Sequence, residues 1–129
     1  MKISVIIPTY NREEHLKNCL SSLLIQTKKP LEILIIDNSD NFYSKKVVNF
    51  FEEQFKLKNI LIYNFKNSIN SGALARNLGV LKAKGDLIAF LDDDVLLDSN
   101  YYEEIEKVFL KYPDALGVHG YNKLINEAY

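Results

Sequence analysis

Three consecutive carboxylates, Asp92, Asp93 and Asp94, follow the apolar run over residues 87–91. Asp92 and Asp94 are two residues apart, so on an extended chain their side chains project to the same side and can converge on one cation. Hard oxygen ligands at this spacing suit Mg²⁺ or Mn²⁺, which share their remaining positions with water and substrate phosphates. We therefore predict a metal site at Asp92 and Asp94. The alternative is that the aspartates solvate a turn and cap the next helix.

Further polar residues follow other apolar runs of the chain. Residues 8–12 come directly after the run at 3–7, and Asp37 ends the run at 31–36. A third segment, residues 70–77, contains small residues that allow a ligand to come close. The chain has two arginines, Arg12 and Arg76, and both fall in these segments. Because a guanidinium suits phosphate better than an ammonium does, this placement favours an anionic ligand, with a solvated surface position for Arg12 as the alternative.

These segments need elements that bring them to one edge of a fold. Apolar runs over residues 3–7, 31–36, 60–63 and 87–91, rich in Ile, Val and Leu, predict strands buried on both faces. Apolar residues at helical spacing lie between and after these runs. The predicted helices carry Leu16, Cys19, Leu20, Leu23 and Leu24; Val47, Val48, Phe51 and Phe55; Leu74, Leu78 and Leu81, with an end at Gly85; and, from about Ser99, Tyr102, Ile105, Phe109 and Tyr112.

The alternation of strands and helices predicts an α/β fold. We expect a Rossmann-like open, mostly parallel sheet with helices on both faces, in which a ligand binds outside the carboxyl ends of the strands. A capping box, Asn11 with Glu14, is expected at the start of the first helix. A final strand is expected around residues 116–118. His15 is then a surface helix residue and His119 a strand-end residue.

Composition excludes several classes of protein. The 129 residues carry a formal net charge of -1, which fits one domain over residues 1–129 and disfavours binding to duplex nucleic acid. The single cysteine, Cys19, reads as a core residue, and no phosphate loop, GxGxxG or Gly-x-Ser-x-Gly motif is present. Without an apolar stretch long enough for a signal peptide or a membrane span, we expect a cytoplasmic chain, with peripheral association at the inner membrane face left open.

The chain resembles the donor-binding half of the inverting family 2 glycosyltransferases, which have a GT-A fold, in the segments ISVIIPTYNR, EILIIDNSD and NSGALARNLGVLKAKGDLIAFLDDDV. The resemblance implies transfer of a sugar from a nucleotide diphosphate sugar, a UDP-sugar above all, to a hydroxyl of an unknown carbohydrate, lipid or protein acceptor. The residues that it implies for nucleotide-sugar binding are Pro8, Thr9, Tyr10, Arg12, Asp37, Gly72, Arg76, Asn77, Asp92 and Asp93. Asp92 and Asp94 would hold the Mn²⁺ or Mg²⁺, and the resemblance makes Asp94 the more direct ligand.

Inversion also needs a general base to deprotonate the acceptor hydroxyl. In the family this base lies well downstream of the Asp-x-Asp segment, and here Glu127 is the sole carboxylate in the last 15 residues. We do not assign the base to Glu127. The sequence therefore predicts a donor-binding half whose acceptor-side portion is absent, supplied by more chain or by a partner, with apolar surface exposed near residues 116–118 and in the tail from Gly120.

Two other functions remain open at this point. A nucleotide-sugar binding module without turnover would fit the missing base. A phosphatase of the haloacid dehalogenase type would fit an Asp-x-Asp after a strand. However, that motif normally follows an early strand and has Thr or Val two places after its second Asp, where this chain has Leu96.

Overall fold

The computed structural model describes residues 1–123, in which strands and helices alternate from end to end. The strands are β1 (Ile3–Thr9), β2 (Glu32–Asp37), β3 (Leu61–Lys66) and β4 (Leu87–Phe90). The helices are α1 (Glu13–Leu24), α2 (Tyr43–Leu57), α3 (Gly72–Lys82) and α4 (Tyr101–Lys111). The predicted α/β alternation is confirmed.

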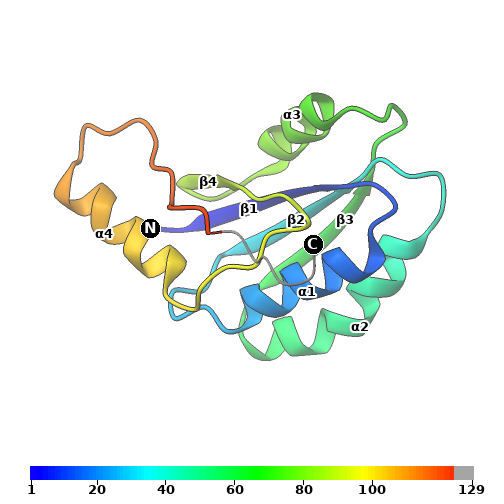
Figure 1. Ribbon diagram of the computed structural model, residues 1–129, viewed down its shortest axis with the longest axis horizontal. Coiled ribbons are helices and arrows are strands. Elements are labelled where there is room, and N and C mark those ends of the chain that lie inside the picture. The colour runs from blue at the N-terminus through cyan, green and yellow to red at the C-terminus, as the bar shows by residue number, and fades with distance from the viewer. Residues whose placement is uncertain (124–129) are drawn as a thin grey trace.

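The strands form one parallel sheet in the order β3-β2-β1-β4 (Figure 1). Thr9 lies opposite Asp37 in the β1–β2 register, and Asp37 lies opposite Lys66 in the β2–β3 register. The carboxyl ends of β1, β2 and β3 are therefore level with one another. Polar side chains from three strands meet at this edge of the sheet.

Helices cover both faces of the sheet, as expected. Figure 1 shows α1 and α2 on one face and α3 on the other. The larger core cluster joins the buried residues of α1 and α2 to β1 and β2, and it includes every member of the apolar sets predicted for these two helices. Burial of these apolar side chains is the main stabilising contribution to the fold.

Helix α3 packs through small residues together with Leu78, one of the three predicted leucines. Leu74 and Leu81 are 43% and 82% exposed, whereas Ala75 and Gly79 are buried. A Cβ atom at Gly79 would lie 2.5 Å from Ile6 Cγ2, so only glycine lets the helix come this close to β1. The predicted leucine stripe is therefore confirmed only at Leu78 and is wrong at Leu74 and Leu81, because close backbone approach decides the orientation of the helix.

The outer strands are not buried on both faces, contrary to the sequence-based expectation. Leu61 of β3 is 50% exposed and Phe90 of β4 is 56% exposed. Both strands are edges of the sheet, and α3 lies over β1 and β2. The edge strands thus keep one face partly open, while the central strands β1 and β2 are buried.

Three local expectations are corrected by the structure. The capping box is not formed, because Asn11 adopts a positive φ of 49° and Arg12 is the N-cap without a side-chain hydrogen bond. Residues 116–118 form no strand, and Leu116 is fully exposed, so His119 is not at a strand end. His15 is an exposed helix residue, as expected. Glu127 lies outside the described residues.

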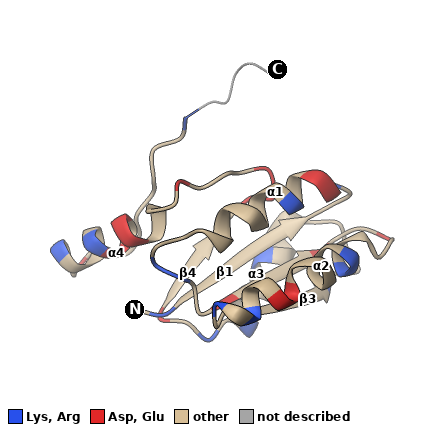
Figure 2. Ribbon diagram, turned by 90° about the horizontal axis from the view of Figure 1, so that it is seen from below, with Lys and Arg blue, Asp and Glu red and all other residues tan. Residues whose placement is uncertain are grey.

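Most charged residues lie on the helices and loops (Figure 2), and the described strands carry Glu32, Asp37 and Lys66 at their ends. The central strand β1 contains none, in keeping with its burial. Within residues 1–123, no helix combines the length and the apolar character that crossing a membrane would require.

Candidate functional site

The aspartate segment after β4 is a turn and not an extension of the strand. β4 ends at Phe90, Leu91 N–H still donates to Ile6 O over 3.0 Å, and Val95 N–H donates to Asp92 O over 3.2 Å. The extended geometry that would bring Asp92 and Asp94 to one side is therefore absent. Instead, each of the three carboxylates is paired with an arginine from another part of the fold, Arg12 or Arg76.

Arg12 holds two of these carboxylates from the start of α1. Its Nη1 lies 3.4 Å from Asp93 Oδ1 and 3.2 Å from Asp94 Oδ2. Arg12 and Asp94 are each about half exposed, at 52% and 48%, whereas the Asp93 side chain is 7% exposed. The outer pair can therefore exchange partners with solvent or a ligand, while Asp93 is part of the interior.

Arg76 holds the third carboxylate from the second turn of α3. Its Nη2 lies 3.0 Å from Asp92 Oδ1. The helix starts after Ser71, whose Oγ accepts from Leu74 N–H. A Cβ at Gly72 would lie 3.0 Å from Arg76 Nη1, so glycine leaves space beside the guanidinium. The small residues at this helix start thus let Arg76 extend to the aspartate turn.

Thr9 joins the aspartate turn to the end of β1. Its Oγ1 donates to Asp93 Oδ2 over 2.8 Å and contacts the hydroxyl of Tyr43 at the start of α2. Since the single Thr9 hydroxyl proton is used toward the carboxylate, Tyr43 is the donor in the second contact. Burial raises the pKa of Tyr43, so its hydroxyl keeps this proton. The chain of hydrogen bonds fixes β1, α2 and the turn relative to one another.

The environment of Asp93 is the most constrained in this cluster. Burial raises the pKa of its carboxyl, while the hydrogen bond from Thr9 and the charge of Arg12 lower it, and the neighbouring charge of Asp94 raises it. Behind the turn, Cys19 Sγ lies 3.7 Å from Asp92 O, and burial raises the pKa of its thiol to about 12. Cys19 is a core residue, as expected.

Asp37 is fully buried, and its predicted contact with a nucleotide stays a prediction. Oδ1 accepts from Ser39 N–H over 2.8 Å and from the Ser39 hydroxyl, and Oδ2 accepts from Ser44 and from Lys66 Nζ, the latter over 3.1 Å. Both oxygens are thus occupied by internal donors. Asp37 thereby fixes the turn after β2 through Ser39.

Sequence reasoning missed three residues of this edge: Tyr43, Ser44 and Lys66. Lys66 was missed because the predicted third strand ended at Tyr63, three residues before the true end at Lys66. The alternation of aromatic and polar residues over 63–66 was the available signal for a longer, half-exposed strand. Tyr43 and Ser44 lie in the first turn of α2, just before its apolar stripe begins.

The remaining predicted residues lie around the same edge. Pro8 is within β1, opposite Ile36, and Tyr10 is exposed just after the strand. Asn77 is exposed on α3, next to Arg76. Together with Thr9 and the arginine and aspartate pairs, they surround the carboxyl end of β1.

The carboxylate oxygens at the aspartate turn can hold a divalent cation only if a bound ligand, such as a phosphate, supplies further oxygen atoms. Within residues 1–123, no three acidic, histidine or cysteine side chains are grouped so that they could hold a metal. Asp92 and Asp94 nevertheless offer exposed hard oxygens, and Mg²⁺ or Mn²⁺ is commonly held by one or two carboxylates together with substrate phosphates. The residues therefore fit a metal shared with a phosphate ligand.

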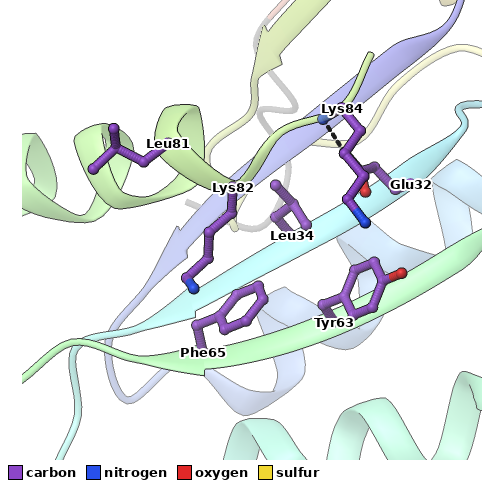
Figure 3. Close-up of a pocket in the computed structure, with 7 residues that line it drawn as sticks. All are labelled: Glu32, Leu34, Tyr63, Phe65, Leu81, Lys82 and Lys84. Carbon is purple, nitrogen blue, oxygen red and sulfur yellow. Dashed lines mark hydrogen bonds between the residues drawn. The ribbon is translucent and has the colours of Figure 1, made fainter.

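A pocket of about 370 Å³ lies away from this cluster, on the α3 face of the sheet (Figure 3). Its walls include Tyr63 and Phe65, and Lys82 Nζ lies 4.4 Å from the centre of the Phe65 ring. Glu32 accepts from Lys84 N–H over 2.7 Å and ties the segment that follows α3 to the sheet. The pocket contains none of the arginine or aspartate residues of the cluster, so we do not assign the chemistry to it.

Comparison with known proteins identifies relatives over nearly the whole chain. The model of the family described as glycosyl transferase family 2 matches residues 4–126. Glycosyltransferase GlyA of Streptococcus pneumoniae serotype 4 is 30% identical over 120 residues, which are 93% of this chain and 17% of GlyA. The chain spans between 16% and 35% of the length of eight curated relatives that it matches.

Solved structures share the fold. S. aureus TarS 1–349 in complex with UDP-GlcNAc superposes with a TM-score of 0.73 at 23% identity, covering 93% of this chain and 37% of that chain. GalNAc-T7 with UDP, GalNAc and Mn²⁺ gives a TM-score of 0.64 at 29% identity, covering 78% of this chain and 19% of that chain. The predicted GT-A type of α/β fold is confirmed.

Proposed function

Because this chain belongs to glycosyl transferase family 2, we propose that it forms the donor-binding part of a glycosyltransferase. The enzyme would move a sugar from a nucleotide diphosphate sugar to an acceptor hydroxyl, with inversion at the anomeric carbon. The observation that carries the proposal is the meeting of both arginines of the chain with three aspartates at the carboxyl edge of the sheet. This is the edge at which open α/β folds bind ligands.

The nucleoside would lie at the end of β1. Pro8, Thr9 and Tyr10 would line the base and ribose, since Thr9 is fixed by Asp93 and Tyr10 is exposed beside it. Asp37 would lie at the adjoining strand end and hold the turn after β2 beside the nucleoside. UDP is the leading donor nucleotide, supported by the UDP-GlcNAc complex of TarS and the UDP complex of GalNAc-T7.

The diphosphate would lie between the N-terminal ends of α1 and α3, close to Arg12 and Arg76. Arg12 and Arg76 can each direct a planar pair of N–H donors at phosphate oxygens. Gly72 leaves space for the approach of the ligand beside Arg76, and Asn77 offers an exposed amide on the same helix. The arginines would thereby orient the donor sugar toward the acceptor side and stabilise the charge that develops on the leaving diphosphate.

A divalent cation fits the same place. Asp94 and Asp92 would hold Mn²⁺ or Mg²⁺, with Asp93 in the interior as the residue that positions the turn. When bound, the ion would neutralise charge on the leaving diphosphate without proton transfer. The Mn²⁺ present with GalNAc-T7 supports this assignment.

We assign the general base to no described residue. The donor-binding role and the binding-module alternative therefore share this site and differ only in turnover. Incubation of the chain with a UDP-sugar and an exogenous acceptor, followed by a measurement of glycosylated acceptor, separates them.

The site itself is tested by comparing uridine, UMP and UDP in calorimetric titrations of the chain. If the arginines receive the diphosphate, affinity rises with each phosphate, and UDP binds at least about tenfold more tightly than uridine. Equal affinity for the three ligands, or binding of none of them, would overturn the proposal.

A further inference from the structure

Both arginines of the chain are already paired with the carboxylates proposed to hold a metal. Arg12 Nη1 lies 3.2 Å from Asp94 Oδ2, and Arg76 Nη2 lies 3.0 Å from Asp92 Oδ1. They come from opposite sides, one from the start of α1 and the other from α3. In the ligand-free chain, the oxygens offered to a cation are therefore held by guanidinium groups.

We propose that Arg12 and Arg76 act as internal counter-cations that give up Asp94 and Asp92 only when a diphosphate receives them. This proposal rests on the proposed function, because it takes the metal and the diphosphate to share the site. Its consequence is that metal and diphosphate binding are coupled through the chain's own ion pairs, in addition to direct contact between the two ligands.

The charges of the cluster support this coupling. Three carboxylates face two guanidinium groups, which leaves a small negative excess when all are ionised. A divalent cation that approaches Asp94 or Asp92 meets a positive group within 3.2 Å of the same oxygen. Coulomb repulsion therefore weakens metal binding as long as the arginines stay in place.

Because both arginine–aspartate ion pairs are partly exposed, exchanging the aspartate for a phosphate costs little free energy. The Arg12 and Asp94 side chains are about half exposed, and so are those of Arg76 and Asp92. Exposed ion pairs contribute little to stability, so breaking them does not disturb the fold. A diphosphate can replace the carboxylate, because two of its phosphate oxygens can accept hydrogen bonds from one guanidinium.

Asp93 keeps Arg12 at the aspartate turn when Arg12 exchanges Asp94 for a phosphate. Its carboxylate is buried and held by Thr9, so one contact of Arg12 remains when the contact to Asp94 is broken. Arg12 can thus turn from Asp94 toward a phosphate while it stays anchored at the turn. Arg76 has only its pair with Asp92 among the described residues, and it is free to turn as a whole.

The test measures binding of Mn²⁺ to the chain by electron paramagnetic resonance, without nucleotide and with saturating UDP or uridine. We expect UDP to raise the Mn²⁺ affinity by roughly 5- to 150-fold and uridine to leave it unchanged. Arg12→Gln and Arg76→Gln should each raise the affinity for Mn²⁺ alone by about three- to tenfold and lower the affinity for UDP in the presence of a chelator.

The matched control is Lys17→Gln, which removes the same charge from α1 but contacts Glu13 and Glu14. It should change neither affinity. If the arginine variants bind Mn²⁺ alone no better than the unchanged chain, the internal counter-cation role is wrong, even if UDP binds. If UDP does not bind to the unchanged chain, the proposed function fails, while the Mn²⁺ measurements still decide whether the arginines compete with metal.

Discussion

Thr9 Oγ1 donates a hydrogen bond to Asp93 Oδ2 over 2.8 Å, although 84 positions separate the two residues in the chain. The bond joins the end of the first strand to the turn after the last described strand. With the Tyr43 hydroxyl on its other side, Thr9 is the point at which β1, α2 and the aspartate turn meet. This buried hydroxyl thus helps to fix the position of the candidate site.

Replacing Thr9 by Val should therefore reduce both stability and nucleotide affinity. The change keeps the shape of the side chain but leaves the Asp93 carboxylate and the Tyr43 hydroxyl without this partner. We expect a loss of about 1 to 3 kcal/mol in the free energy of unfolding, measured by urea denaturation. Thr27→Val, which removes an exposed hydrogen bond to Glu103, is the control and should cost less. If the two variants lose the same free energy of unfolding, Thr9 does not join β1, α2 and the aspartate turn as described.

Lys66 should be essential for the buried charge of Asp37. Lys66→Met removes the cation 3.1 Å from a carboxylate that is completely shielded from solvent. We expect a loss of about 3 kcal/mol in the free energy of unfolding, because an unpaired charge stays buried. The exposed Lys56 on α2 offers the control Lys56→Met. A loss below about 1 kcal/mol would show that Asp37 does not depend on this partner.

Arg76→Ala should weaken UDP binding and leave the fold intact. The residue is partly exposed, and its one ion pair in the described chain, with Asp92, is on the surface. Loss of a charged hydrogen bond to phosphate should reduce affinity by roughly 10- to 100-fold in calorimetry. Lys82→Ala, at the other end of the same helix, should not change it. Should Arg76→Ala unfold the chain without altering affinity in the folded fraction, Arg76 would be a structural residue.

Cys19 should resist alkylation in the native chain. Its thiol is completely buried, and its pKa is raised to about 12, so almost no thiolate is present at pH 8. Iodoacetamide labelling, followed by mass spectrometry, should be slow in buffer and fast in concentrated urea. Rapid labelling in buffer would mean that α1 opens behind the aspartate turn.

The sequence predicted the order of elements well, because continuous apolar runs and helical stripes reflect burial directly. It failed where packing depends on small residues. Leu74 and Leu81 had the right spacing for a buried stripe, yet Gly79 sets the orientation of α3, since only a residue without a side chain fits against Ile6. Periodicity of large residues carries no information on such a contact.

The sequence predicted which residues belong to the candidate site better than it predicted how they are arranged. Both arginines and all three aspartates do meet at one edge, as the strand-end rule required. The extended spacing of Asp92 and Asp94 was wrong because the strand ends at Phe90. Asp37 is buried and paired with Lys66, which comes from another strand. Contacts between distant elements decided both outcomes.

The central claim is that the aspartate turn binds a nucleotide diphosphate together with a divalent cation. Its most direct test is a calorimetric titration of UDP into the unchanged chain and into Asp94→Asn, each with Mn²⁺ and then with a chelator. We predict that UDP binds the unchanged chain with Mn²⁺, that the chelator weakens this binding, and that Asp94→Asn removes the effect of the metal without unfolding the chain. UDP binding that is indifferent to both Mn²⁺ and Asp94, or no binding at all, would contradict the account.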